Sequence, residues 1–136
     1  MRKGLIILLA IIACITMIGA ERGEQTYDNS IDFEGQGFQK MKATAYCMGH
    51  HTANGDAVYT GGCAASSEHL GDVAIIYTAK GEYLGMYYCN DTGGQPIEDG
   101  YVIDLYRKNL TQCQMFMRLI APSDYTVWVK YVKGNG

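Results

Sequence analysis

Apolar and polar positions alternate along several short segments of this chain, as they do in strands that bury one face. Alternation or short apolar runs predict strands at residues 42–47, 63–66, 73–78, 83–90, 101–106 and 125–132. Connections rich in glycine and other turn-forming residues separate several of these runs, and residues 79–81 form the tightest of them. The pattern therefore predicts a mostly β domain, a small closed six-stranded β-barrel.

One segment follows a helical period instead. Its apolar face carries Leu110, Cys113, Met117 and Ile120. Asn109 can cap the start of this helix, Gln112 completes a capping-box-like pair, and Pro122 lies just past its end. A shorter helical turn is expected at residues 67–71, where a glycine closes it. The domain should thus contain one real helix and one short helical turn beside its strands.

The N-terminal segment differs from the rest of the chain. Residues 1–3 include two basic side chains, residues 4–20 carry no charge, and polar residues follow abruptly. This pattern predicts a secretory signal peptide over residues 1–20, cleaved after Ala20. An uncleaved membrane anchor and lipidation at Cys14 are the alternatives. Residues 21–40 are expected to form a flexible linker, and residues 41–136 the folded domain.

Cysteine usage agrees with export. Four of the five cysteines lie in the expected domain: Cys47, Cys63, Cys89 and Cys113. An even number of cysteines in an exported domain predicts two disulfides, for which three pairings are possible. We favour Cys47–Cys63 with Cys89–Cys113, because these pairs close short loops. The alternative is four buried thiols.

Charge narrows the range of partners. Removal of residues 1–20 would take away two of the 11 basic residues and none of the 14 acidic ones, which changes the net charge from −3 to −5. An acidic surface does not suggest a nucleic-acid partner. The 11 tyrosines suit a groove that binds sugars by stacking, although tyrosine is also an ordinary strand residue.

Asp91 and Asp104 are the candidate catalytic residues, because each carboxylate lies at the edge of a strand-like run. The turn-forming residues between them are Gly93, Gly94, Pro96 and Gly100. Such a loop can bring the two carboxylates together, and one of them then keeps its proton near neutral pH. A protonated carboxylic acid can cleave a glycosidic bond. A purely structural role is equally open on these residues alone, with Asp91 bracing the turn and Asp104 capping a barrel end.

With these segments placed, the region from about Lys42 to Val132 resembles the 3D family, which is named for three aspartates. Residues 91–94 are similar to the family's D-T-G-G element, and residues 102–106 to its I-D-x-[YFW] element. Further similarity lies at residues 43–46, 113–117 and 127–129. The two aspartate motifs, in this order within a barrel-like pattern, carry the resemblance. It implies a double-psi β-barrel.

The resemblance also implies an activity. Related lytic transglycosylases of the MltA type, and resuscitation-type factors, cut peptidoglycan between N-acetylmuramic acid and N-acetylglucosamine and leave a 1,6-anhydro end. Carried over by motif, Asp104 matches the acid/base and Asp91 its carboxylate partner. The expected substrate-binding residues are Thr44, Tyr46, Thr92, Gly93 and Gly94, for which ordinary strand and turn roles are the alternative.

Two departures from the family pattern bear on catalysis. Ser66 stands near the place of the family's first aspartate, so the trio is a pair. The lysine-glycine expected between the two motifs is replaced by Glu98-Asp99-Gly100, in a slightly longer loop. A barrel that binds the cell wall without cutting it is therefore the second hypothesis.

Other functions fit less well. Asp-Thr-Gly is also the aspartic-peptidase signature, but residues 88–90 do not form the apolar run that precedes it there. Cys47, His50 and His51 match no closed zinc pattern, so we expect no metal and no cofactor. We expect a secreted, cell-wall-associated monomer that binds peptidoglycan glycan strands. It should bind no nucleic acid and meet the membrane only through an uncleaved N-terminal segment.

Overall fold

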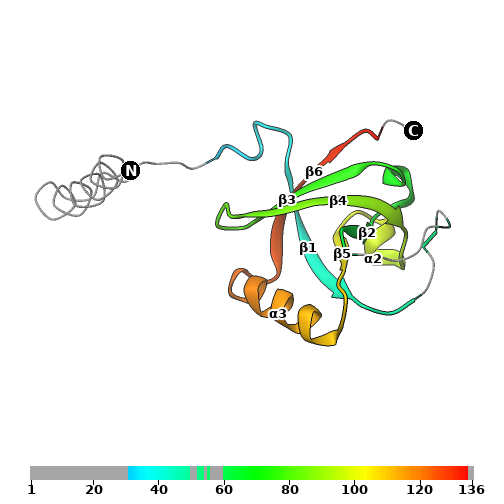
Figure 1. The fold of residues 1–136 in the computed structure, drawn as a ribbon. Helices are drawn as coiled ribbons and strands as arrows, with labels where there is room; N and C mark the ends of the chain where they lie inside the picture. The colour runs from blue at the N-terminus through cyan, green and yellow to red at the C-terminus, as the bar shows by residue number, and fades with distance from the viewer. Residues whose placement is uncertain (1–30, 50–51, 54, 56–59, 135–136) are drawn as a thin grey trace, which may run out of the picture. The chain divides into compact units, whose positions relative to one another are not determined.

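The domain is a closed barrel of six strands (Figure 1). A computed structural model describes residues 31–49, 52–53, 55 and 60–134 of the 136-residue chain. The strands are β1 (Gln39–Tyr46), β2 (Gly62–Ala64), β3 (Val73–Thr78), β4 (Tyr83–Asp91), β5 (Val102–Tyr106) and β6 (Thr126–Val132). They follow each other around the barrel in the order β1-β5-β2-β4-β3-β6.

Helical segments account for little of the described chain. They are η1 (Ser67–His69), α2 (Gln95–Glu98), α3 (Leu110–Ile120) and η2 (Ala121–Ser123). The predicted fold class is confirmed: a mostly β, six-stranded barrel with one longer helix and a short helical turn after β2. The single turn of α2, within the loop between the two aspartates, was not predicted. None of the helices in the described part of the chain is long and apolar enough to cross a membrane.

The barrel mixes parallel and antiparallel pairs. β1 pairs with β5 and β2 with β4 in parallel, whereas the remaining neighbours run antiparallel. This mixed, closed arrangement is consistent with a double-psi barrel. The short strand β2 lies between β4 and β5, so it touches both strands that carry the candidate aspartates. Strands that are far apart in the sequence therefore form one wall.

Every second side chain along the strands points into the barrel, and these side chains form its core. The fully buried core side chains include Ala43, Ile76, Ile103, Leu105, Val127 and Val129. On β5, Ile103 and Leu105 point inward, and Asp104 between them is half-buried on the opposite face. Successive side chains of a strand point to opposite faces, so the Asp104 carboxylate points outward because Ile103 and Leu105 point into the core.

Helix α3 begins as predicted. The side chain of Asn109 accepts a hydrogen bond from the Gln112 N–H at 2.9 Å, which caps the first turn. Cys113, Phe116 and Ile120 form its buried face. Leu110, expected on that face, is 64% exposed, so the helix packs on the barrel only from Cys113 onward. Figure 1 shows α3 outside the strands, at one end of the barrel.

The folded unit starts before the expected boundary at residue 41. It runs from Ile31, and β1 begins at Gln39. Phe33 is buried and stacks on Trp128, with their ring centroids 5.1 Å apart. Residues 31–40 therefore belong to the barrel rather than to a flexible linker, because an aromatic side chain anchors them. The predicted signal peptide at residues 1–20 and the rest of the linker lie outside the described residues.

Candidate functional site

Ala64 on β2 is the shared neighbour of both candidate aspartates. It lies opposite Asp104 on β5 and, after a register shift in the β2–β4 pair, opposite Asp91 on β4. Neighbouring strands are about 4.8 Å apart, so the backbones of the two aspartates are separated by about 10 Å. The side chain between them is a single methyl group. The barrel thus brings the two predicted residues to one wall, on either side of a small residue.

Among the described residues, one side-chain hydrogen bond holds Asp104. Thr44 on β1 lies opposite it in the parallel β1–β5 pair, and the Thr44 hydroxyl donates to Asp104 Oδ1 at 2.8 Å. Burial raises the pKa of Asp104, the hydrogen bond from Thr44 lowers it, and the charge of Asp91 raises it, so that the net shift is upward. From the sequence we expected the carboxylate pair to cause this shift, but burial is the larger cause.

Asp91 has a different environment. Its Oδ1 accepts hydrogen bonds from the backbone N–H groups of Ala53, at 3.0 Å, and Thr92, at 2.9 Å. Its Oδ2 accepts from the Tyr46 hydroxyl at 3.2 Å. Within the described part of the chain, three donors therefore face this carboxylate. The two aspartates therefore have different environments: Asp91 accepts several hydrogen bonds, whereas Asp104 is half-buried and its pKa is raised.

Tyr46 links the pair to the rest of the wall. Burial, and then the charge of Asp91, raise the pKa of Tyr46 far above its usual value, so its hydroxyl stays protonated and donates to Asp91. Its ring meets that of Tyr106 edge-on, with the centroids 5.4 Å apart. Tyr106 was not among the predicted site residues. Its position two residues after Asp104, on the same face of β5, was the signal that could have identified it.

The predicted turn residues after Asp91 have separate roles. Thr92 is half-buried, whereas Gly93 and Gly94 are exposed. A Cβ atom on Gly93 would lie 2.3 Å from Ile97 Cδ1, so α2 folds back closely over this position. Gly94 precedes α2 as its N-cap residue. These glycines shape the loop between the aspartates.

In the part of the chain that the structure describes, neither Ser66 nor Glu98 is hydrogen-bonded to the two aspartates. Ser66 is buried, and its hydroxyl lies 3.4 Å from Glu68 Oε1. Glu98 accepts hydrogen bonds from the backbone and the hydroxyl of Ser67, which lower the pKa of Glu98 and tie α2 to η1. In the described part of the chain, the side-chain hydrogen bonds of Asp91 and Asp104 come from neither Ser66 nor Glu98.

The cysteines meet in a different pairing from the one favoured on loop length. The structure shows four free thiols, and Cys63 Sγ lies 3.6 Å from Cys89 Sγ. The side chain of Cys113 contacts that of Cys47. The partners differ because β2 and β4 run side by side, which sets Cys63 opposite Cys89. Among the described residues no cluster of three or more potential metal ligands occurs, and His50 and His51 lie outside them.

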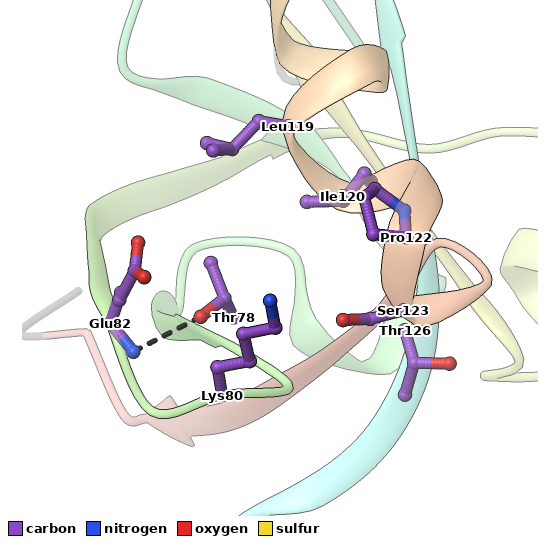
Figure 2. A pocket seen from close by; sticks show the side chains of 8 residues that line it. All are labelled: Thr78, Lys80, Glu82, Leu119, Ile120, Pro122, Ser123 and Thr126. Atoms are coloured by element: carbon purple, nitrogen blue, oxygen red, sulfur yellow. Dashed lines mark hydrogen bonds between the residues drawn. The ribbon is translucent and has the colours of Figure 1, made fainter.

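The pocket in Figure 2 is separate from the aspartates. It has a volume of about 100 Å³ and lies between the β3–β4 turn and the end of α3. Thr78, Lys80 and Glu82 line one side, where the Glu82 N–H donates to the Thr78 hydroxyl at 3.0 Å. This volume is well below the roughly 300–1,000 Å³ of pockets that enclose small ligands. The aspartate wall is the candidate site because of its side-chain chemistry, and the pocket in Figure 2 is not part of it.

A scan against models of known protein families and a search of curated proteins both gave no match. The fold and the site define the class of protein as a small closed β-barrel. One wall of the barrel carries two aspartates in different environments.

The hydroxyl of Thr44 gives a direct test of this geometry. Thr44→Val removes the hydrogen bond that lowers the pKa of Asp104, so that pKa should rise further. NMR titration of the Asp104 carboxyl carbon in the full chain measures the change. Thr126→Val is the matched control, because the Thr126 hydroxyl contacts Lys42 and Asp124 instead. An unchanged or lower Asp104 pKa in Thr44→Val would contradict the assigned hydrogen bond.

Proposed function

We propose that this domain cleaves the glycan strands of peptidoglycan by a lytic transglycosylase-like reaction, with Asp104 as acid/base. The observation that carries the proposal is the contrast between the two aspartates. Asp104 is half-buried with a raised pKa, whereas Asp91 accepts three hydrogen bonds on the same wall. Two carboxyl groups in environments that differ in this way can serve as acid and as stabilising carboxylate.

The first step uses the proton of Asp104. The protonated carboxyl donates to the glycosidic oxygen, the bond between that oxygen and the anomeric carbon breaks, and positive charge develops on the sugar ring. A raised pKa keeps this proton available closer to neutral pH than an ordinary aspartate allows. The Thr44 hydroxyl fixes the orientation of the carboxyl group meanwhile.

The second step closes the sugar ring on itself. Asp104, now ionised, accepts the proton of the sugar's C6 hydroxyl, and that oxygen attacks the anomeric carbon to give the 1,6-anhydro product. One carboxyl group serves both steps, and no water enters. Asp91 stabilises the developing positive charge, and the hydrogen bonds from Tyr46 and Ala53 hold it in place.

The substrate class comes from the resemblance to the 3D family and from the chemistry of the wall. The Tyr46 hydroxyl bonds to Asp91 and its ring packs edge-on against Tyr106, and aromatic side chains suit a sugar chain. Thr92, next to Asp91, adds another hydroxyl. Peptidoglycan lies outside the cell membrane, so the proposal includes export through the segment at residues 1–20.

The experiment is a product analysis. The purified chain is incubated with insoluble peptidoglycan, and the soluble fraction is examined by mass spectrometry. We expect muropeptides with 1,6-anhydro ends. Products with ordinary reducing ends would contradict the ring-closing step, because they require water. Cleaved stem peptides with intact glycan would contradict glycan cleavage and favour the aspartyl peptidase.

A non-catalytic wall-binding barrel is the second candidate, and one observation favours it. Ser66 takes the place of the family's first aspartate, and Glu98 is bound to Ser67 instead of supplying a third carboxylate near the pair. In that case the protein should sediment with insoluble wall and release no soluble product. Asp104→Asn should then leave the bound fraction unchanged.

A further inference from the structure

Two thiols face each other inside the barrel wall. Cys63 on β2 and Cys89 on β4 are register partners in a parallel pair, and both are fully buried. Their sulfur atoms lie 3.6 Å apart. This distance is close to van der Waals contact, so no other side chain lies between the two sulfur atoms.

We propose that Cys63–Cys89 and Cys47–Cys113 are the two disulfides of the oxidised protein. A disulfide needs Cα atoms about 4.4–6.8 Å apart. Register partners on adjacent strands meet this condition, since the strands are about 4.8 Å apart. Bond formation then requires the two sulfurs to approach each other by roughly 1.5 Å, from their present 3.6 Å to a bond length of about 2.05 Å. Side-chain rotation can supply much of this movement without breaking the β2–β4 pairing.

The second pair follows from the other contact. Cys47 comes directly after β1 ends at Tyr46, and Cys113 lies on the buried face of α3. Their side chains touch, so the remaining two cysteines are also placed to react with each other. The crosslink would join α3 to the end of β1. If Cys63 pairs with Cys89, the two remaining domain cysteines, Cys47 and Cys113, are also in contact and can pair with each other.

The reaction requires an oxidant, which we take to be a small-molecule or protein disulfide. The thiolate of one cysteine attacks this disulfide, forms a mixed disulfide and releases one thiol. The second cysteine, as its thiolate, then attacks the protein sulfur of the mixed disulfide and displaces the other thiol. Two protein thiols are oxidised, and the one disulfide oxidant is reduced to two thiols. Because Cys63 and Cys89 are buried, this exchange takes place while the barrel folds.

The location of the first crosslink gives it a structural consequence. Strand β2 has only three residues, and Cys63 immediately precedes Ala64, the neighbour of both aspartates. Cys89 lies two residues before Asp91 on β4. A bond here would fix the spacing of β2 and β4 at the aspartate wall, whether or not the wall is catalytic.

Peptide mapping tests the pairing directly. The full chain is refolded with oxidised and reduced glutathione, alkylated, and cleaved without reduction by cyanogen bromide and trypsin. Cleavage at Met48 separates Cys47 from Cys63, so the four cysteines fall on peptides 43–48, 49–80, 87–107 and 109–115. Cys14 falls on peptide 4–17, which distinguishes its crosslinks.

We expect peptide 49–80 linked to 87–107, and 43–48 linked to 109–115. Any other link among these four peptides would overturn the proposal. Alkylated Cys63 or Cys89 in the refolded protein would do the same. These results do not depend on any activity, so they are independent of the proposed function.

Two paired variants provide the stability control. Reduction should lower the melting temperature of the wild-type chain by roughly 10 °C or more, since closing loops of this length stabilises a small domain substantially. Cys47→Ala/Cys113→Ala should retain a drop on reduction, due to Cys63–Cys89. Cys63→Ala/Cys89→Ala should retain only the drop due to the other pair. No change on reduction of the wild type would contradict the crosslinks, and the mapping result decides even where a variant fails to fold.

Discussion

Asp104→Asn is expected to abolish the release of anhydro-muropeptides while the barrel stays folded. Asparagine has nearly the shape of aspartic acid and can still accept the hydrogen bond from Thr44, but it has no acidic proton. General acid–base catalysis is typically worth about 10²–10⁴-fold, so the rate should fall by at least this range. Quantification of the soluble anhydro products by mass spectrometry gives the rate.

The same variant should not lose stability. The pKa of Asp104 is raised in the folded state, so its stabilising contribution is present below the unfolded pKa and is lost as the pH rises through the folded value. Above the folded-state pKa, the fold must hold this half-buried carboxylate in its unfavourable ionised form. Asparagine removes that unfavourable charge, and the melting temperature at pH 7 should therefore equal or exceed that of the wild type.

Asp99→Asn is the matched control for this prediction. Asp99 belongs to the loop between the two aspartate motifs but is exposed, and its carboxylate accepts a hydrogen bond from the Gln95 side chain at the surface. The activity of the Asp99→Asn variant should stay near the wild-type value. Full activity in Asp104→Asn would rule out Asp104 as the acid. A similar loss in both variants would point to the loop as a whole instead.

Ile120→Ala should cause a large loss of stability, because α3 packs on the barrel through this residue. Ile120 is 1% exposed and belongs to the main core cluster. Removing three carbons from a buried isoleucine costs about 2–5 kcal/mol, through lost burial and the cavity left behind. A domain of this size has a total stability of only about 5–15 kcal/mol. Urea denaturation, monitored through the single Trp128, measures the change.

The adjacent residue supplies the control. Leu119 is on the same helix and loses the same number of carbons on change to alanine, but it is 53% exposed. Leu119→Ala should therefore alter the free energy of unfolding by less than about 0.5 kcal/mol. Similar losses in the two variants would mean that α3 is not oriented as described.

Local patterns were sufficient to predict the strands and the main helix of this fold. The apolar run at residues 73–78 matches β3 at both ends, and Asn109 caps α3 as expected. These features could be predicted because each depends on neighbours within a few positions: a period of two, or a side chain that reaches a nearby N–H group. The two aspartates were also identifiable, since each is part of a short motif at the edge of a strand.

The partners across the barrel could not be predicted in this way. The insertion of β2 between β4 and β5 sets Ala64 beside both Asp91 and Asp104, and sets Cys63 opposite Cys89. Loop length favoured other cysteine pairs, because loop length ignores which strands become neighbours. The sequence placed Phe33 in a linker, because no local pattern indicates its stacking on Trp128.

The local sequence thus establishes which segments become strands and which face of each is apolar. Closure of the barrel establishes which side chains share a wall, how deeply Asp104 is buried and hence why its pKa is raised. The physical reason is that hydrogen bonding and apolar periodicity act between near neighbours in the chain. Burial and strand register depend on contacts between residues far apart in sequence, and no local pattern records them.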